Sequence, residues 1–388
     1  MTATTITPGF LQTRTGALAS FIALALFGGV LGCAKATPRT APPIDVASLQ
    51  PLNAAESVEL PDSSLAWFDA RLLPIEGRAF DDTATYYERL PVRAVGNVSD
   101  TALWVSKHTS GFAYRFVTDS PEIGASWDGG GAMNHMAATG NSGLDLYKRL
   151  PNGEWEFCAV GRPNTERTTK TLAKNLATEP TEYLLYLPLY QTVSQLQIGV
   201  QPGSLLAAAP PRPAGEKPLV FLGTSITQGG CASRAGMSHP AILGRWFDRE
   251  VYNLGFSGSG RMEPIMAELL GEIDASAYFL ECLPNMDAEM VAERIEPFVH
   301  RLRELRPTTP IVLVESPLEG DRADNIELLK IYNNLIRDKV PNIYWLPGAG
   351  QLDGPENATV DGVHPTDLGF YRMAVAYKPM VAKVLAAN

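Results

Sequence analysis

The second half of this chain alternates short apolar runs with longer helical patterns, which restricts the fold more than any other feature. Apolar runs of strand length recur after Lys217, at 218–222, 250–254, 277–282, 310–315 and 342–346. Helical patterns lie between them, most clearly at 288–305, which contains Pro297, and at 325–339. Such alternation predicts βαβ units and a mainly parallel five-stranded sheet with helices on both faces. We therefore expect a three-layer α/β/α domain over 217–388.

The first half of the chain has a different pattern. Short apolar or alternating runs are separated by Gly, Asn, Asp and Pro, among them 90–95, 113–117, 183–187 and 195–200. Short strands with frequent turn residues indicate an antiparallel sandwich or jelly roll. We expect an all-β domain at 59–203, and a Pro-containing linker at 204–216 before the α/β domain.

Polar residues follow several of the predicted strands. Ser225 lies in a Gly-Thr-Ser-Ile turn after the first apolar run, Gly258 follows the second run, and Asn285 follows the third. Asp361 and His364 are three residues apart in the last loop before a helix. The carboxyl ends of parallel strands meet at one edge of a sheet, so we expect these residues to lie together.

These residue types suit acyl transfer. A serine hydroxyl needs an imidazole base, and a carboxylate holds that imidazole in place. A glycine amide and an asparagine side chain can bind a developing oxyanion. Each residue also has a simpler interpretation, because Ser225 and Asn285 are common helix caps, and Gly258 and Asp361 are common in turns. The combination favours chemistry, since the chain contains only five His residues.

Together the four segments resemble the SGNH or GDSL-like hydrolase superfamily, whose markers are Ser, Gly, Asn and His in that order. The resemblance implies a flavodoxin-like α/β/α fold with Ser225 as nucleophile and oxyanion donor. Gly258 and Asn285 would be the other oxyanion donors, His364 the general base, and Asp361 the residue that orients it. The first segment reads Gly-Thr-Ser-Ile where many members have Gly-Asp-Ser. The third reads Leu-Pro-Asn-Met where many have Gly-x-Asn-Asp, and both departures bear on subfamily and substrate.

Residues 143–147, Gly-Leu-Asp-Leu-Tyr, are similar to a bacterial subgroup with a Gly-x-Asp-Leu-Tyr N-terminal domain fused to the hydrolase. The resemblance thus extends from about residue 60 to the end, and implies a serine esterase. We expect it to hydrolyse small acyl esters, acetyl above all, on a carbohydrate. A lipid or aryl ester hydrolase is the nearest alternative. An alternative of another class is a glycan-binding surface protein on a degenerate hydrolase scaffold.

The N-terminus has the pattern of an export signal. Arg14 precedes the uncharged run 17–31, which is short for a membrane span, and we expect a signal peptide at 1–32. The following Cys33 completes a Val-Leu-Gly-Cys sequence that resembles the bacterial lipobox, which implies lipidation of this cysteine.

The other interpretation of this end is ordinary cleavage after the Ala-Lys-Ala sequence at 34–36. If Cys33 is lipidated, residues 33–58, rich in Pro, are a tether. We expect an exported bacterial protein, periplasmic or anchored to the outer membrane as a lipoprotein, with membrane contact only through the lipidated N-terminus.

Charge and motif content restrict the partners. The formal net charge of −10 argues against nucleic acid and leaves a small-molecule or glycan ester as the expected substrate. No phosphate-loop motif, zincin His pair or Cys-x-x-Cys occurs, so the sequence predicts neither a cofactor nor a metal. It predicts no oligomeric state.

Four further residues have two interpretations each. His135 and Arg261 either contact the substrate or have only structural roles. Cys231 and Cys282 follow the Ser225 turn and precede the Asn285 loop, so they either form a disulfide or pack as buried thiols.

Overall fold

The computed structural model describes residues 44–164, 166–318 and 322–387, which belong to a single packed unit. The predicted signal peptide and Cys33 lie outside these residues. Among the described residues, no helix is both long and apolar enough to span a bilayer.

The second half is the predicted parallel sheet, with strand order β12-β11-β13-β14-β15. Its strands are β11 (Leu219–Gly223), β12 (Val251–Gly255), β13 (Ala277–Glu281), β14 (Ile311–Val314) and β15 (Ile343–Leu346). All four neighbouring pairs run parallel, and Leu222 lies opposite Leu254 and Leu280. The five predicted strands are therefore confirmed.

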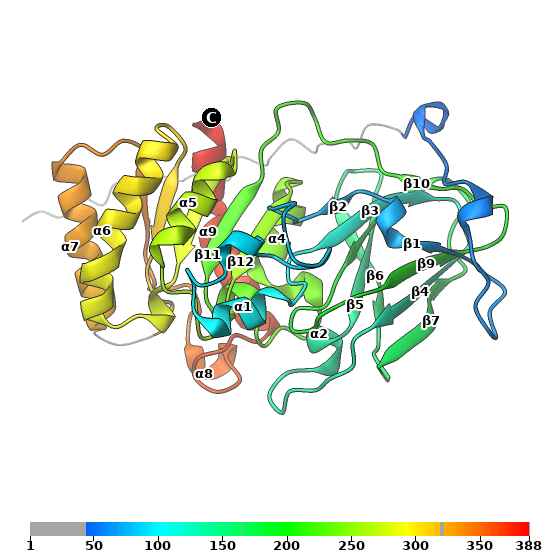
Figure 1. Ribbon diagram of the computed structural model, residues 1–388, viewed down its shortest axis with the longest axis horizontal. Helices are drawn as coiled ribbons and strands as arrows, with labels where there is room; N and C mark the ends of the chain where they lie inside the picture. The colour runs from blue at the N-terminus through cyan, green and yellow to red at the C-terminus, as the bar shows by residue number, and fades with distance from the viewer. Residues whose placement is uncertain (1–43, 165, 319–321, 388) are drawn as a thin grey trace, which may run out of the picture. The chain divides into compact units, whose positions relative to one another are not determined.

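Helices cover both faces of this sheet (Figure 1). They are α4 (His239–Phe247), α5 (Pro264–Glu272), α6 (Ala288–Leu305), α7 (Ala323–Arg337) and α9 (Asp367–Ala386), with the short α3 (Ser225–Gln228) and α8 (Pro355–Ala358). Because side chains alternate along a strand, Leu222 of β11 packs with α5, α6 and α7, whereas Phe221 packs with α4 and α9. The predicted three-layer fold is confirmed, and α6 continues through Pro297.

The first half contains two antiparallel sheets, with strand orders β1-β9-β4-β7 and β10-β3-β8-β5-β6, and β2 paired to β3. The strands are β1 (Ala66–Asp69), β2 (Ile75–Glu76), β3 (Ala113–Thr118), β4 (Glu122–Asp128), β5 (Leu144–Arg149), β6 (Trp155–Gly161), β7 (Arg167–Lys174), β8 (Thr181–Tyr186), β9 (Leu196–Val200) and β10 (Leu206–Ala208). Trp127 of one sheet and Phe116 and Leu146 of the other share an apolar core. This confirms the predicted β-domain.

The strand predicted at 90–95 is wrong. This segment contains a 3₁₀ helix, η4 (Val92–Ala94), and is followed by α1 (Asp100–Ser106). Leu90 and Ala94 pack into the α5–α7 side of the parallel sheet rather than into the sandwich. Pro91 also cannot donate to a strand ladder. The apolar residues here are therefore an interdomain contact.

Other short elements complete the part of the chain that the structure describes. They are α2 (Ala138–Asn141), η1 (Val46–Ser48), η2 (Ala54–Glu56), η3 (Ala70–Leu72), η5 (Ala235–Met237) and η6 (Leu283–Asn285). The predicted linker includes β10, which pairs with β3. Within the predicted tether, the Leu52 amide donates to the Leu206 carbonyl at 2.8 Å. Parts of both connecting segments therefore rest on the β-domain, whereas the predicted domain boundaries stay a prediction.

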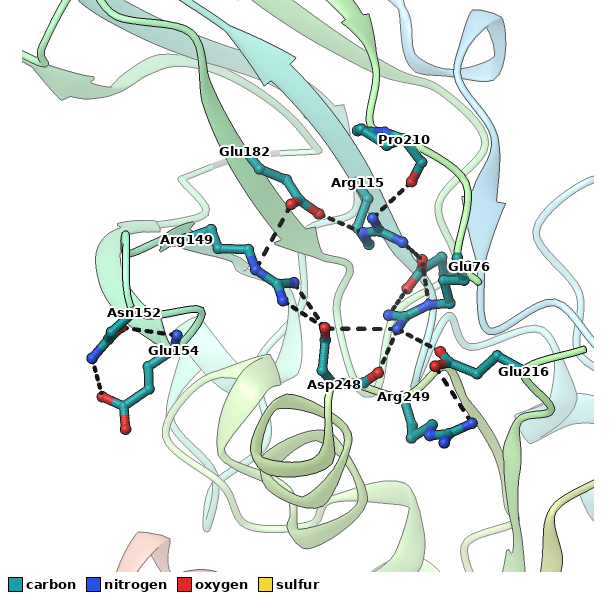
Figure 2. A network of polar contacts seen from close by, with 11 residues as sticks. Glu76, Arg115, Arg149, Asn152, Glu154, Glu182, Pro210, Glu216, Asp248 and Arg249 are labelled. Carbon is teal, nitrogen blue, oxygen red and sulfur yellow. Dashed lines mark hydrogen bonds and ion pairs between the residues drawn. The ribbon is translucent and has the colours of Figure 1, made fainter. Parts of the chain in front are cut away.

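Ion pairs join the β-domain to the α/β domain (Figure 2). Arg149 of β5 donates to Asp248 after α4, with a closest separation of 2.5 Å. Arg212 of the linker pairs with Glu76 of β2 at 3.0 Å. We call the whole cluster the interdomain ion-pair network; it consists of Glu76, Arg115, Arg149, Glu182, Arg212, Glu216, Asp248 and Arg249.

Candidate active site

The turn after β11 places Ser225 at the first position of α3. Gly223 ends the strand, and a Cβ atom there would lie 1.9 Å from the Thr227 Oγ1 atom, so only glycine fits without rearrangement. The Thr224 side chain caps the helix by accepting from the Ile226 amide at 3.2 Å. The interpretation of Ser225 as the N-cap is therefore wrong, and its hydroxyl is free for other contacts.

Ser225 begins a continuous chain of hydrogen bonds. Its Oγ atom lies 3.0 Å from Nε2 of His364, and Nδ1 of His364 lies 2.8 Å from Oδ2 of Asp361. The Asp361 Oδ1 atom accepts from the amides of Val363 and His364 at 3.0 and 2.8 Å. The structure thus brings together the three residues that the sequence predicts as nucleophile, base and orienting carboxylate.

The Asp361 carboxylate is held in its charged form. Partial burial opposes ionisation, but hydrogen bonds from the His364 amide and ring and from the Val363 amide outweigh it and lower the pKa of Asp361 to about 2. A carboxylate acceptor favours the tautomer in which Nδ1 of His364 carries the proton. Nε2 then has a lone pair that faces the Ser225 hydroxyl.

The Asp361–His364 loop is closed on itself. The Val360 amide donates to the His364 carbonyl at 2.8 Å, and Gly362 has a φ of +87°, a conformation that favours glycine. The Cys231 amide also donates to the Pro365 carbonyl at 3.0 Å. The loop that bears the imidazole is therefore tied to the chain that leaves the Ser225 turn.

Three hydrogen-bond donors at this sheet edge have no acceptor among the described residues. Gly258, with φ +69°, lies in the turn after β12, where the amides of its neighbours Ser259 and Gly260 are both bonded but its own is not. The Ser225 amide is in the first turn of α3, where no intrahelical acceptor exists. The Asn285 Nδ2 atom is buried and unpartnered. These are the three predicted oxyanion donors.

Comparison with known proteins agrees with this geometry. Residues 216–382 match the GDSL-like Lipase/Acylhydrolase family, and residues 65–206 match the GxDLY N-terminus of SGNH-hydrolase-type esterases. A GDSL-like lipase candidate from Bacteroides ovatus is 34% identical over 83% of this chain and 98% of its own, with a TM-score of 0.78. This chain belongs to the GDSL-like lipase/acylhydrolase family. The resemblance read from the sequence is confirmed.

More distant solved structures share only the fold with this GDSL-like protein. A salicylyl-acyltransferase from a tetracycline biosynthetic pathway is 18% identical over 84% of this chain and 97% of its own, with a TM-score of 0.64. An acetyl xylan esterase from Butyrivibrio proteoclasticus is 13% identical over 83% of this chain and all of its own (100%), with a TM-score of 0.52. No curated protein matches the chain significantly.

The β-domain of this GDSL-like protein contacts the Ser225 turn directly. The Tyr190 hydroxyl donates to the Ser225 carbonyl at 3.2 Å, and the Ser110 hydroxyl donates to the Gln228 carbonyl at 2.6 Å. The Gln228 side chain donates to Nδ1 of His108 at 3.1 Å and accepts from the Ser257 amide at 2.9 Å. Gln228 therefore links the nucleophile turn, the Gly258 turn and the β-domain.

Arg89 makes a second connection of this kind. Its guanidinium is buried and donates to the carbonyls of Val105 and His108 in the β-domain, and to those of Asn253 and Gly255 at the end of β12. Every acceptor that it meets is a backbone oxygen. Arg89 thus fixes the strand end that leads into the Gly258 turn.

The Gly-x-Asp-Leu-Tyr sequence holds the segment that follows α3. Asp145 is fully buried, accepts from Arg234 at 2.9 and 3.0 Å, and accepts from the Gly236 amide at 2.8 Å. The Tyr147 hydroxyl also accepts from Arg234. A Cβ atom at Gly143 would lie 2.4 Å from a backbone oxygen. The motif is therefore a docking contact between the domains.

A buried polar cluster behind the Ser225 turn is absent from the sequence-based prediction. Thr227 Oγ1 donates to Glu281 at 2.7 Å, and Nε2 of His239 lies 3.1 Å from the same carboxylate. All three side chains are buried. The one signal in the sequence is Glu281, a lone acidic residue at the end of an otherwise apolar run.

The structure separates the two predicted substrate contacts. His135, from the loop between β4 and α2, has its ring centroid 5.8 Å from that of His364. Arg261 is exposed beyond the Gly258 turn, and none of its contacts with described residues reaches Ser225 or His364. His135 therefore lies beside the relay, whereas Arg261 does not contact it.

The cysteines of the described residues are free thiols, so the buried-thiol interpretation of Cys231 and Cys282 holds and the disulfide does not form. Burial raises the pKa of Cys231 to about 11, and the nearby Asp361 charge acts in the same direction. A thiol that stays protonated near neutral pH is a poor nucleophile.

A cavity of about 480 Å³ lies further along the same sheet edge. It is lined by segments that follow β14 and β15, including Glu315, Ser316, Asn325, Gly348 and Asp353. None of Ser225, Asp361 and His364 lines it, so the ester chemistry is not placed there.

Proposed function

We propose that this GDSL-like protein is a serine esterase that removes small acyl groups, acetyl above all, from a carbohydrate. The observation that carries the proposal is the hydrogen-bonded chain from Ser225 through His364 to Asp361. Beside it lie three donors without acceptors, and these are the parts that ester hydrolysis through an acyl-enzyme needs.

In the first half-reaction, Ser225 Oγ attacks the ester carbonyl carbon while His364 Nε2 takes the hydroxyl proton. Asp361 stabilises the resulting imidazolium through Nδ1. The carbonyl oxygen becomes an oxyanion and accepts from the amides of Ser225 and Gly258 and from the Asn285 side chain. Collapse of this intermediate breaks the bond to the alcohol, which leaves with the proton from His364.

In the second half-reaction, water attacks the acyl group on Ser225 while His364 again acts as base. Collapse releases the free acid and returns the proton to the serine. Because the same donors bind the oxyanion in both steps, they act on two transition states.

Two observations support a carbohydrate ester. Solved structures of the same fold include the Butyrivibrio acetyl xylan esterase and a family two carbohydrate esterase from Clostridium thermocellum in complex with cellohexaose. The β-domain also contributes a polar side chain beside the relay, since the ring centroid of His135 lies 5.8 Å from that of His364. We include His135 as a substrate contact in the proposal, and Arg261 as a more remote one.

The proposal includes export and anchoring through a lipid on Cys33. Growth of a bacterial host with a labelled fatty acid should label the wild type, and Cys33→Ser should remove the label. Absence of label in the wild type would contradict the anchor and favour cleavage after Ala36, and labelling that survives the substitution would mean that the lipid is not on Cys33.

The decisive experiment compares hydrolysis of p-nitrophenyl acetate, longer p-nitrophenyl esters and acetylated xylan by wild type and Ser225→Ala. We expect preference for acetate and a loss of kcat of about 10⁴-fold or more in the variant. Cys231→Ser is the matched control, and it should keep its activity because its thiol is not the nucleophile. A fluorophosphonate should label the wild type at Ser225.

Other outcomes would favour the alternatives. Better turnover of long acyl chains than of acetate would indicate a lipid or aryl ester hydrolase. Absence of both turnover and labelling, with glycan binding that survives Ser225→Ala, would indicate a binding protein on a hydrolase scaffold.

A further inference from the structure

Three side chains that can ligate a metal converge beside the nucleophile. His135, Cys231 and His364 each offer one ligand atom, and these atoms lie within 4.8 Å of one another. They come from a β-domain loop, from the segment after α3 and from the loop before α9. No short spacing motif joins them, which is why the sequence predicts no metal.

The chemistry of this set suits a borderline-soft cation. Imidazole nitrogen and thiolate sulfur are common ligands of Zn²⁺, whereas Mg²⁺ prefers oxygen. With bonds of about 2.0–2.3 Å in a tetrahedral site, ligand atoms are roughly 3.3–3.7 Å apart. The observed separation therefore requires the three atoms to close by about 1 Å.

Both imidazoles have a hydrogen bond at Nδ1 of the kind that metal-ligating histidines usually make. The Nδ1 atom of His364 lies 2.8 Å from the Asp361 carboxylate, and that of His135 lies 2.9 Å from the Asn134 Oδ1 atom. An oxygen acceptor at Nδ1 leaves the Nε2 lone pair for the metal, and such outer hydrogen bonds are usual around ligating histidines.

The three ligands are held to different degrees by their surroundings. Cys231 and the His364 loop are joined by the hydrogen bond from the Cys231 amide to the Pro365 carbonyl at 3.0 Å. His135 is only half-buried and lies on a different loop. We therefore expect the His135 side chain to make most of the movement that closes the set.

We propose that His135, Cys231 and His364 form a binding site for one Zn²⁺ ion, and that the bound ion reversibly inhibits the esterase. Binding forms two Zn–N bonds and one Zn–S bond, and releases the thiol proton to solvent. A water molecule, or the Ser225 hydroxyl 3.0 Å from His364 Nε2, supplies the fourth ligand. The ion inhibits because it occupies the nitrogen that must accept the serine proton. The inhibitory half rests on the proposed function, whereas the binding half does not.

Binding is tested in the full chain without reference to activity. Co²⁺ is titrated into the Ser225→Ala variant, in which all three ligands remain, and the near-ultraviolet thiolate-to-cobalt absorption is recorded. We expect one equivalent to bind with that absorption and Zn²⁺ to displace it. Adding Cys231→Ser should abolish the band and weaken binding by about tenfold or more. Cys158→Ser, which changes a free thiol outside the site, should leave both unchanged.

His135→Ala keeps the result interpretable if Cys231→Ser does not fold, because His135 lies in a partly exposed loop. It should weaken Co²⁺ binding by a similar factor while the thiolate band persists at saturation. Absence of the band, its persistence in Cys231→Ser, or its loss in Cys158→Ser would overturn the site.

Inhibition is tested with wild type and p-nitrophenyl acetate. Zn²⁺ should inhibit, EDTA should restore the rate, and Mg²⁺ should have no effect. Measured against its own zinc-free rate, Cys231→Ser should require about tenfold more Zn²⁺ or more for the same inhibition. Equal sensitivity of the two proteins would place the inhibitory ion elsewhere. If the wild type has no esterase activity, the proposed function fails, while the Co²⁺ titration still decides the metal site.

Discussion

The β-domain meets the α/β domain in two regions of different chemistry. The interdomain ion-pair network (Figure 2) consists of Arg, Glu and Asp side chains, such as Arg149 with Asp248. Under the Ser225 turn the contacts are neutral, from Tyr190 and Ser110 to backbone carbonyls and from Gln228 to His108. A charge close to the relay would change the energy of the imidazolium that forms on His364, whereas a neutral hydrogen bond positions the turn with little such effect. We infer that the first region holds the domains together and the second positions the reacting groups.

Two charged residues are exceptions: Arg89 donates to the Asn253 and Gly255 carbonyls at the end of β12, and Asp145 holds the segment after the Ser225 turn. We expect Asp145→Asn to lower the free energy of unfolding by about 3–5 kcal/mol, since it leaves the Arg234 charge without its buried partner. Urea unfolding measures this loss. Glu156→Gln is the matched control: its pair with Lys148 is largely exposed, and we expect a loss below about 1 kcal/mol. Equal losses in the two variants would mean that the Gly-x-Asp-Leu-Tyr motif is not a docking contact.

We call the contacts of Tyr190, Ser110, Gln228 and His108 under the Ser225 turn the neutral region. Its buried His108 should give the protein a defined sensitivity to acid. Burial, reinforced by the Arg89 charge, lowers the pKa of His108 from its ordinary value of 6.5 to about 4. Between these values the unfolded chain binds a proton that the folded chain does not. The contribution of His108 to the free energy of unfolding is therefore fully present above pH 6.5. It decreases as the pH falls toward 4, by up to about 3 kcal/mol.

Replacement of this imidazole isolates its share of the acid sensitivity. His108→Gln keeps an oxygen acceptor for Gln228, and urea unfolding between pH 6.5 and 4 should show a shallower loss than in wild type. The exposed His300 serves as control, and His300→Gln should keep the wild-type slope. A wild-type slope in His108→Gln would show that His108 titrates normally.

The ion-pair network should affect stability without affecting catalysis. Glu76 accepts from Arg115 at 2.9 Å and from Arg212 at 3.0 Å and is partly exposed, so we expect Glu76→Gln to cost about 2 kcal/mol. The kcat on p-nitrophenyl acetate should stay unchanged. Asp69→Asn weakens an exposed pair in the same domain and should cost less than about 1 kcal/mol. A large fall in kcat for Glu76→Gln would contradict the division of roles between the two regions.

The sequence predicted the parallel sheet well because its strands are buried on both faces and appear as continuous apolar runs. The strand prediction for residues 90–95 was wrong for a related reason. Its apolar residues are also buried, but against a distant part of the chain, and periodicity does not reveal which surface covers a run. The strand β10 was placed in a linker because three residues are too few to give a pattern.

The candidate site also contains residues that the sequence predicted and residues that it did not. Ser225, Asp361 and His364 were predicted to lie together because they stand in short segments at strand ends and in the last loop. Gln228 and Arg89 have no such context: Gln228 meets His108 from 120 positions away, and Arg89 reaches Gly255 across 166. Isolated polar residues such as these meet their hydrogen-bond partners only when the two domains pack together, so the sequence pattern does not indicate the contacts.

The smallest predicted effect is the sharpest test of the neutral region. Tyr190→Phe removes the hydroxyl that donates to the Ser225 carbonyl, and Tyr87→Phe removes one that lies 2.9 Å from the Tyr114 hydroxyl in the β-domain. Each loses one buried hydrogen bond, so each should cost about 1 kcal/mol of stability. Only Tyr190→Phe should lower kcat, by about three- to tenfold, because a turn that is less firmly held spends less time in the attacking geometry. If both variants kept full kcat, the neutral contacts would be structural only, and positioning of Ser225 would depend on the α/β domain alone.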